Sequence, residues 1–426
     1  MTQRTLADWL SYLEQLHPTA IDMGLDRSRE VAGRLGLGRP APRVVTVTGT
    51  NGKGSTCAFL AAMLGEQGQR VGVYSSPHLL RYNERVLIDG AEASDEALCE
   101  AFAAVEAARG EISLTYFEMG TLAAFWLFER ANLDAVVLEV GLGGRLDAVN
   151  LIDSDVAVVT SIGIDHADWL GDTRESVAFE KAGIFRTGKP AVCGDLEPPA
   201  PILEQARQLG SPLVLRGRDF DLAMGEDDWH WRGRSASGEA LSLHNLPLLD
   251  LPMENAALAL QVYALLDLPW QPDSLAAALL RTRVTGRLDR RTVQWHGEER
   301  HLLLDVGHNP HASQYLASRL RATPPKGVRH AVFGLLADKD LDGVLEPVLG
   351  LVQDWAVAPL PTGRSRPAQE LEAALQARGA QVSCHGDIAA ALVAQCDAAS
   401  TDDEILVFGS FYSVADALEW LAKAAQ

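Results

Sequence analysis

Short apolar runs alternate with longer helical patterns along this 426-residue chain. Runs rich in β-branched residues predict strands at 43–48, 135–140, 156–160, 302–306, 331–334 and 405–408. The patterns between them predict helices, among them 55–67, 118–131, 254–265, 311–321 and 414–424. Strands that are apolar on both faces suit a parallel sheet that helices cover on each side. The alternation therefore predicts a doubly wound α/β architecture.

Two stretches interrupt this alternation. Residues 212–250 are richer in Trp, Gly and Asp and predict short strands and loops that belong to the first domain. Residues 283–299 are strongly charged and contain the best candidate for a linker, after which the alternation restarts. We therefore expect a first domain over residues 1–288, a linker over 289–298 and a second, smaller domain over 299–426.

Composition and charge exclude several classes of protein. Hydrophobic residues make up 47% and charged residues 22%, as in an ordinary globular protein, and no apolar run approaches the ~20 residues that span a bilayer. The net charge of −20 argues against a nucleic-acid partner. The chain starts without an apolar signal segment, and its five cysteines form no CxxC pair. We expect a cytoplasmic protein that binds neither membranes nor nucleic acid.

A glycine-rich turn joins the first apolar strand to the helix that follows it. Residues 44–56 read VVTVTGTNGKGST. The three glycines allow main-chain N–H groups to approach phosphate oxygens closely, and the start of a helix offers its positive dipole end to the same anion. The pattern predicts a nucleotide-binding phosphate loop, in which Lys53 reaches the terminal phosphates and Ser55 or Thr56 contacts a bound magnesium ion.

The spacing in this loop departs from the pattern G-x-x-x-x-G-K-[ST]. Gly54 separates Lys53 from Ser55, and only two residues separate Gly49 from Gly52. An ordinary glycine-rich turn with a solvated lysine is the alternative. The strand before the turn and the helix after it favour the phosphate loop.

Two further polar side chains follow apolar strands. Glu139 lies near the end of the 135–140 run, directly before a Gly-Leu-Gly-Gly sequence, and His166 follows the 156–160 run. Ligands of doubly wound sheets bind at the carboxyl ends of the strands. Burying an unpaired carboxylate is costly, and a carboxylate at this edge can hold magnesium. Glu139 is therefore a candidate metal ligand, whereas His166 alone fits a loop histidine equally well.

The loop and several later motifs carry a resemblance to a known family. TGTNGKGS (48–55) is similar to the loop of the Mur ligase superfamily, ATP-dependent ligases that join an amino acid to an acyl acceptor. The later motifs resemble the folate branch of that superfamily and occur in the expected order: YSSPHL (74–79), LTYFE (114–118), LEVGLGGRLDAVN (138–150), SIGIDHADWLG (161–171), EKAGIF (180–185), GR (286–287) and DVGHNPHA (305–312).

The resemblance implies a fold and a reaction. The fold is a phosphate-loop domain with a doubly wound, mostly parallel sheet, followed by a smaller C-terminal α/β Rossmann-like domain. The folate branch ligates L-glutamate to dihydropteroate and to the γ-carboxylate of reduced folates, through an acyl phosphate, with release of ADP and phosphate. It implies ATP as co-substrate, two Mg²⁺ ions with K⁺ as a possible addition, and a monomer.

The resemblance also implies roles for individual residues. ATP is expected to contact Thr50, Asn51, Gly52, Lys53, Gly54, Ser55, Asn255, Arg287 and Asp305. The expected metal ligands are Ser76, Glu139, His166 and Lys181, the last as a carbamate. The expected catalytic residues are Lys53, Lys181, His166, Asp305 and His308. The expected substrate contacts are Asp22, Met23, Gly24, Leu25, Thr115, Tyr116, Phe117, Glu118, Leu146, Asp147, Ala148 and Ser410.

Several alternatives stay open. Without the resemblance, Lys181 would be interpreted as an exposed helical lysine and residues 22–27 as a loop entering a helix. A cell-wall Mur ligase would normally carry a further N-terminal domain, and only about 40 residues precede the loop. A monofunctional folylpolyglutamate synthase would lack the pterin-contacting segment at 22–27. A nucleotide-sensing protein without ligase activity would lose Glu139, His166 and Lys181, which are all present.

Overall fold

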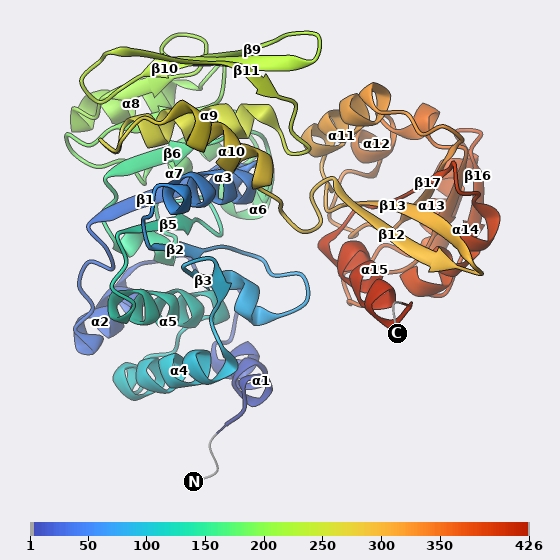
Figure 1. The fold of residues 1–426 in the computed structure, drawn as a ribbon. Coiled ribbons are helices and arrows are strands. Elements are labelled where there is room, and N and C mark those ends of the chain that lie inside the picture. The colour runs from blue at the N-terminus through green and yellow to red at the C-terminus, as the bar shows by residue number, and fades with distance from the viewer. Residues whose placement is uncertain (1–3, 425–426) are drawn as a thin grey trace. The chain divides into compact units, whose positions relative to one another are not determined.

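The computed structural model describes residues 4–424 and divides the chain into two compact units, Met1–Thr282 and Arg283–Gln426. Figure 1 shows the first unit in blue to yellow and the second in orange to red. The linker prediction for residues 289–298 is wrong in structural terms. These residues form strand β12 (Asp289–Trp295), the turn after it and the first residue of the next strand, Glu298, and both strands belong to the sheet of the second unit.

The first unit contains the following helices and strands. The helices are α1 (Leu6–Leu16), α2 (Asp26–Leu35), α3 (Lys53–Glu66), α4 (Asp95–Arg109), α5 (Tyr116–Arg130), α6 (Ala167–Leu170), α7 (Arg174–Ala182), α8 (Ala200–Leu209), α9 (Met253–Ala264) and α10 (Pro272–Arg281), with 3₁₀ turns η1 (Tyr82–Arg85) and η2 (Ala148–Leu151). The strands are β1 (Arg43–Thr48), β2 (Val71–Tyr74), β3 (Val86–Ile88), β4 (Ala91–Glu92), β5 (Ala135–Glu139), β6 (Val156–Val159), β7 (Ala191–Cys193), β8 (Leu213–Leu215), β9 (Asp221–Met224), β10 (Asp228–Arg234) and β11 (Ala240–Pro247).

The main sheet of the first unit runs in the order β4-β3-β2-β5-β1-β6-β7-β8 within the described residues. Every neighbouring pair from β2 to β8 is parallel, and β3 and β4 are antiparallel additions at one edge. Strand β1 lies between β5 and β6, with Val47 opposite Glu139 and Thr48 opposite Val159. This register brings the loops after these three strands to one edge of the sheet.

Helices cover both faces of this sheet, as the apolar strands require. Helix α3 packs against α9 and α10 on one side, and α4 and α5 lie on the other with α1 and α2 against them (Figure 1). Residues 212–250 form β8 to β11, so the prediction of short strands in this stretch is confirmed. Strands β9 to β11 make a separate antiparallel sheet, and Trp231 on β10 donates from Nε1 to the Ala257 carbonyl of α9 at 3.0 Å.

The second unit is a smaller α/β domain. Its strands are β12, β13 (Glu298–Asp305), β14 (Arg329–Phe333), β15 (Asp354–Val357), β16 (Gln381–Cys384) and β17 (Glu404–Phe408). Its helices are α11 (Pro310–Ala322), α12 (Leu341–Leu345), α13 (Ala368–Gln376), α14 (Ile388–Ala398) and α15 (Phe411–Ala424), with the 3₁₀ turn η3 (Leu349–Leu351).

The sheet of the second unit runs in the order β12-β13-β17-β14-β15-β16 and is parallel except for β12. Asp305, the last residue of β13, lies opposite Phe408, the last residue of β17. The loops that follow these two strands therefore emerge side by side. Of the helices in residues 4–424, none has the length and apolar character needed to cross a membrane.

Candidate active site

The loop between β1 and α3 has a backbone shape that depends on glycine at two positions. Gly49 has φ of 152° and Gly52 has φ of 86°, in the left-handed half of conformational space. A Cβ atom at Gly49 would lie 1.8 Å from Thr160 Oγ1, and one at Gly52 would lie 2.5 Å from Asn255 Oδ1. The loop therefore packs closely against the segment after β6 and against the start of α9. Asn255, a predicted ATP contact, lies in this first turn of α9.

Hydrogen bonds that the loop donates to the segment after β6 fix its position. The N–H of Thr50 donates to the Ser161 carbonyl at 2.9 Å, and the N–H of Asn51 donates to Ser161 Oγ at 3.0 Å. Helix α3 begins at Lys53, whose ammonium group donates to the Gly49 carbonyl at 3.0 Å. Two sources of positive charge thus meet at this loop: the N-terminal end of the 14-residue helix and the ammonium group of Lys53. Both would attract a phosphate group.

Glu139 stands beside this loop. It is the last residue of β5 and is 5% exposed. A Cβ atom at Gly54 would lie 3.7 Å from Glu139 Oε2, and the N–H of Ser76 is 3.4 Å from the same oxygen. Ser55 is also buried, in the first turn of α3. The structure therefore brings the predicted Ser76 and Glu139 together at the phosphate loop.

A cleft in the first unit collects the other predicted residues of this group. Its lining includes Lys53, His166 and Lys181, together with Thr48, Gly49, Thr50, Val140, Gly141, Leu142, Gly143, Asp165 and Leu170. His166 is exposed and has φ of 53°. Sequence reasoning did not single out Asp165, which precedes His166 and accepts a hydrogen bond from the N–H of His166 at 2.9 Å.

Lys181 differs from the exposed helical lysine that its sequence context alone indicates. It lies on α7 and is 3% exposed. Burial, and to a lesser extent the positive charge of Lys53, lower the pKa of its ammonium group to about 7, although the charges of Asp165 and Asp147 oppose the shift. A substantial fraction of the side chain is consequently neutral near pH 7, and only the neutral amine is a nucleophile.

The residues around the loop fit a cation that is bound partly by phosphate. Among residues 4–424, no three His, Cys, Asp or Glu side chains are grouped closely enough to hold a metal ion by themselves. Mg²⁺ is commonly held by one or two carboxylates together with water and substrate phosphates. Glu139, buried next to the phosphate loop, suits that mode, and the Ser76 hydroxyl is a second oxygen donor nearby.

The predicted substrate residues other than Ser410 form a second group in the same unit. The Phe117 ring packs on the backbone of Gly141, since a Cβ atom there would lie 2.7 Å from it. A Cβ atom at Gly143 would lie 3.7 Å from Met23 Cε. The glycine-rich stretch after β5 therefore connects the cleft to the segment Asp22–Leu25 and to the start of α5.

Asp147 is buried at the end of this glycine-rich stretch. Its carboxylate accepts hydrogen bonds from the N–H groups of Leu142 and Val149, each at 2.9 Å, and it caps η2, which begins at Ala148. Burial raises the pKa of Asp147 to about 6, although these N–H groups favour its charged form. Leu146, directly before it, is half-buried.

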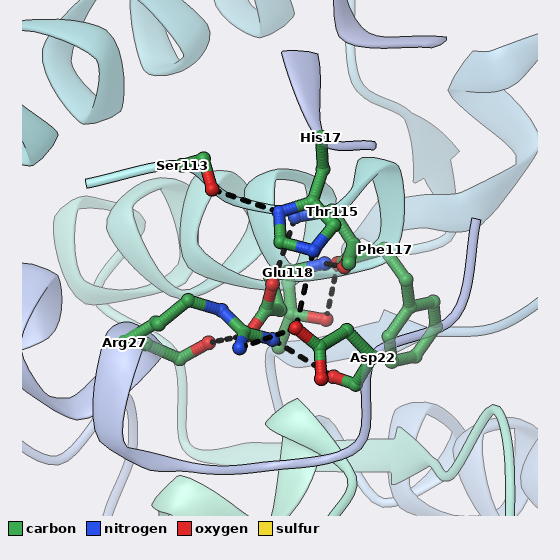
Figure 2. Close-up of polar contacts among 9 residues, drawn as sticks. His17, Asp22, Arg27, Ser113, Thr115, Phe117 and Glu118 are labelled. Carbon is green, nitrogen blue, oxygen red and sulfur yellow. Dashed lines mark hydrogen bonds and ion pairs between the residues drawn. The ribbon is translucent and has the colours of Figure 1, made fainter. Parts of the chain in front are cut away.

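Figure 2 shows the contacts of the Asp22–Leu25 segment with the start of α5. Arg27 donates to Asp22 Oδ2 at 2.6 Å and to Glu118 Oε1 at 3.1 Å, and His17 Nε2 lies 3.1 Å from Asp22 Oδ2. Thr115 caps α5 and forms a capping box with Glu118, while Tyr116 is half-buried. Sequence reasoning missed His17 and the role of Arg27, because their contacts with Ser113 and Glu118 join segments that are far apart in the sequence.

The second unit gathers its own predicted residues at the ends of β13 and β17. Asp305 accepts hydrogen bonds from the N–H groups of Leu288 at 3.0 Å and Gly307 at 2.8 Å. Burial raises the pKa of Asp305, and the Arg287 charge opposes this shift.

The Phe411 ring lies near two of the predicted residues, Arg287 and His308. Its centroid is 5.5 Å from Arg287 Cζ and 6.0 Å from the centroid of the His308 ring. His308 Nδ1 lies 2.9 Å from the Val306 carbonyl, an acceptor only, so that nitrogen carries the proton. Ser410 is buried and accepts a hydrogen bond from the N–H of Tyr412 at 3.1 Å.

Comparison with known proteins agrees with both units. Residues 47–194 match the Mur ligase middle domain, and residues 286–411 match the Mur ligase glutamate ligase domain. The dihydrofolate synthase/folylpolyglutamate synthase of Escherichia coli is 47% identical over 414 residues, which cover 97% of this chain and 95% of that protein. The fold and the loop thus define a ligase of the Mur type. The chain belongs to the dihydrofolate synthase/folylpolyglutamate synthase family.

Solved structures give the same result. E. coli FolC in complex with DHPP and ADP is 45% identical, has a TM-score of 0.93, and each chain covers 99% of the other. A bifunctional folylpolyglutamate synthase/dihydrofolate synthase with Mn, AMPPNP and L-glutamate bound is also 45% identical, with a TM-score of 0.89 and 98% coverage of both chains. The fold class expected from the sequence is confirmed.

Proposed function

We propose that this protein ligates L-glutamate to dihydropteroate, which gives dihydrofolate, and to the γ-carboxylate of reduced folates. ATP supplies the energy and leaves as ADP and phosphate. The observation that carries the proposal is the convergence of Lys53, Lys181 and the phosphate loop on one cleft, with Glu139 buried beside the loop. The related structures with ADP, DHPP, AMPPNP and L-glutamate support the same set of small-molecule substrates.

The first chemical step is transfer of the γ-phosphoryl group of ATP to the carboxylate of the acyl acceptor. The loop from Thr50 to Ser55 surrounds the phosphates, which the N–H groups at the start of α3 bind, and Lys53 stabilises the charge that develops on the transferred group. The main-chain groups of the Asp22–Leu25 segment, the Phe117 ring and Asp147 orient the acceptor. The amine of L-glutamate then attacks the acyl phosphate and displaces phosphate. We assign Arg287, Asp305, His308 and Ser410 to the ATP and glutamate side of this reaction.

Two Mg²⁺ ions would neutralise charge on the phosphates in this reaction. Ser76, Glu139 and His166 are the residues that would hold one of them, and a carbamate on Lys181 would hold the other. A divalent metal is supported by the related structure that contains Mn. The use of K⁺, a monomeric state and a cytoplasmic location stay predictions from the sequence.

The decisive experiment measures the ADP that the enzyme releases when ATP and Mg²⁺ are present. Three reactions are compared: one with each acceptor and L-glutamate, and one without L-glutamate. Dihydropteroate with L-glutamate and a reduced monoglutamyl folate with L-glutamate should both support release, and omission of L-glutamate should abolish sustained turnover. ADP release with the reduced folate and L-glutamate, but not with dihydropteroate and L-glutamate, would restrict the activity to polyglutamylation. No release with either acceptor would overturn the proposal.

A further inference from the structure

Arg27 joins two parts of the chain that are far apart in the sequence. Its Nη1 donates to Asp22 Oδ2 at 2.6 Å, and its Nη2 donates to the main-chain carbonyl of Asp22 at 2.8 Å. The same Nη2 reaches Glu118 Oε1, at the start of α5, at 3.1 Å. One guanidinium group therefore fixes both the side chain and the backbone of Asp22 to a helix 91 residues further along the chain.

Glu118 is the anchor of this arrangement. It is 3% exposed, and both of its carboxylate oxygens are engaged. Oε1 also accepts from Ser28 Oγ at 3.0 Å, and Oε2 accepts from the N–H of Thr115 at 2.8 Å. A buried carboxylate is tolerated when hydrogen bonds and a cation satisfy it, and here α5 and the first turn of α2 supply them together.

His17 holds Asp22 from the other side, as Figure 2 shows. Its side chain is 8% exposed, with Nε2 at 3.1 Å from Asp22 Oδ2 and Nδ1 at 2.9 Å from Ser113 Oγ. An ionised carboxylate only accepts, so Nε2 donates to Asp22. The contacts of His17 and Arg27 meet on the same oxygen of Asp22, which leaves the side chain little freedom.

The backbone immediately after Asp22 is open. Met23 and Gly24 are half-buried, and a Cβ atom at Gly24 would have nothing within 4 Å. Within residues 4–424, the hydrogen bonds found include none from the N–H groups of Met23 or Gly24. Backbone N–H and C=O groups held half-buried are obligatory hydrogen-bonding groups, and water or a ligand must satisfy them.

We propose that His17, Arg27 and Glu118 are positioning residues that hold the Asp22–Leu25 segment in a shape whose open main-chain groups receive the heteroaromatic head of the acyl acceptor. A pterin ring carries hydrogen-bond donors and acceptors along its edge, and successive N–H and C=O groups of a fixed backbone match such an edge. The three side chains act through the segment, and this replaces the direct substrate contact expected of Glu118, because both of its carboxylate oxygens are engaged within the protein. This inference rests on the proposed function and names how its acceptor is recognised.

The test compares Arg27→Gln with Arg29→Gln. Arg29 is an exposed residue of the same helix and forms an ion pair with Asp26, so its variant makes the same change of charge without removing a contact to Asp22 or Glu118. Arg27→Gln is expected to raise the KM for dihydropteroate by at least about tenfold, while the KM for ATP stays within about twofold. The KM of Arg27→Lys for dihydropteroate should lie between those of the wild type and Arg27→Gln, because one ammonium group cannot keep all three contacts. His17→Gln should raise the same KM by a smaller factor.

Amide hydrogen exchange of the peptide over residues 20–28 provides a readout that does not depend on turnover. Exchange should accelerate in Arg27→Gln and His17→Gln, and not in Arg29→Gln. A wild-type protein that does not turn over dihydropteroate, with this exchange pattern intact, would refute the proposed function alone. An Arg27→Gln variant that lowers the melting temperature but leaves the KM for dihydropteroate and the exchange rates unchanged would overturn the positioning role. If Arg27→Gln does not fold, His17→Gln decides by the same two measurements.

Discussion

The side chains of Lys53 and Lys181 line one cleft, and the positive charge of Lys53 helps to lower the pKa of Lys181 to about 7. Burial is the larger cause of this shift, because Lys181 is 3% exposed on α7. Lys53 thus favours the neutral form of the Lys181 amine, which is the form that the proposed carbamate requires. CO₂ adds to a neutral amine and gives, with loss of one proton from the nitrogen, a carbamate, a negatively charged oxygen ligand of the kind that Mg²⁺ prefers.

Activity should therefore depend on CO₂, and more strongly at low pH. The neutral fraction of Lys181 falls as the pH drops below about 7, so removal of bicarbonate should reduce ADP release more at pH 6 than at pH 8. Lys181→Gln should lose at least about 100-fold in kcat. Lys189→Gln, which alters an exposed lysine paired with Asp155, is the control and should retain activity. Carbon-13 NMR under labelled CO₂ should show a carbamate signal in the wild type that Lys181→Gln lacks; its absence from both would contradict the carbamate.

Loss of either charged group at the phosphate loop should stop the first chemical step. Lys53→Ala and Glu139→Ala are each expected to reduce ADP formation by at least about 100-fold, because each removes charge that acts on the transferred phosphoryl group or on the cation bound to it. Glu100→Ala, on the exposed face of α4, is the control. Thermal unfolding should show that all three variants are folded. Normal turnover in a folded Lys53 or Glu139 variant would disprove these roles.

The shape of the loop should be as important as its charge. Gly52→Ala places a side chain at φ of 86° and 2.5 Å from Asn255 Oδ1, so either the loop or α9 must shift. Left-handed backbone costs a residue other than glycine about 1–2 kcal/mol, so ATP affinity should fall by about tenfold or more. Gly65→Ala is the matched control, because it lies within α3 with nothing within 4 Å of the added Cβ, and it should be neutral or slightly stabilising. Equal ATP affinities of the two variants, measured by calorimetry, would contradict this prediction.

The pattern of apolar residues predicted six strands of the two sheets, missed others inside them, such as β2, β7 and β15, and assigned the edge strand β12 to a linker. Strands β1, β5, β6, β13, β14 and β17 fall within a few residues of their predicted positions, since a strand buried on both faces is apolar throughout. Strand β12 was interpreted as a linker because it contains Arg290 and Arg291. An edge strand with an exposed face tolerates such charges, and local sequence cannot distinguish it from a charged linker.

The sequence identified candidate residues that lie within one local motif. It did not identify residues that come together only when distant segments of the chain meet. The phosphate loop and Glu139 are readable because a strand end and its turn are local. The pairing of Arg27 with Glu118 spans 91 residues, and no pattern along the chain reports it. Lys181 shows the same limit, because its burial follows from packing around α7 and not from its neighbours in the sequence.

His330, at the start of β14 in the second unit, lies between two acidic residues. Its Nδ1 is 2.8 Å from Asp354 Oδ2, and its Nε2 is 3.6 Å from Asp403 Oδ2. Burial lowers the pKa of His330, but the hydrogen bond and the charges of Asp354 and Asp403 outweigh burial, so the net shift is upward.

A histidine with a raised pKa in the folded state stabilises that state when it is protonated. This stabilisation is complete below the unfolded-state pKa, about 6.5, and is lost as the pH rises through the higher folded-state pKa. His330→Gln should therefore lower the melting temperature at pH 6, and the difference from the wild type should shrink by pH 9. Scanning calorimetry at both pH values checks this, with His301→Gln, an exposed residue of β13, as the control. If the melting temperature of His330→Gln lies below that of the wild type by the same amount at pH 6 and pH 9, the side chain contributes packing and not charge.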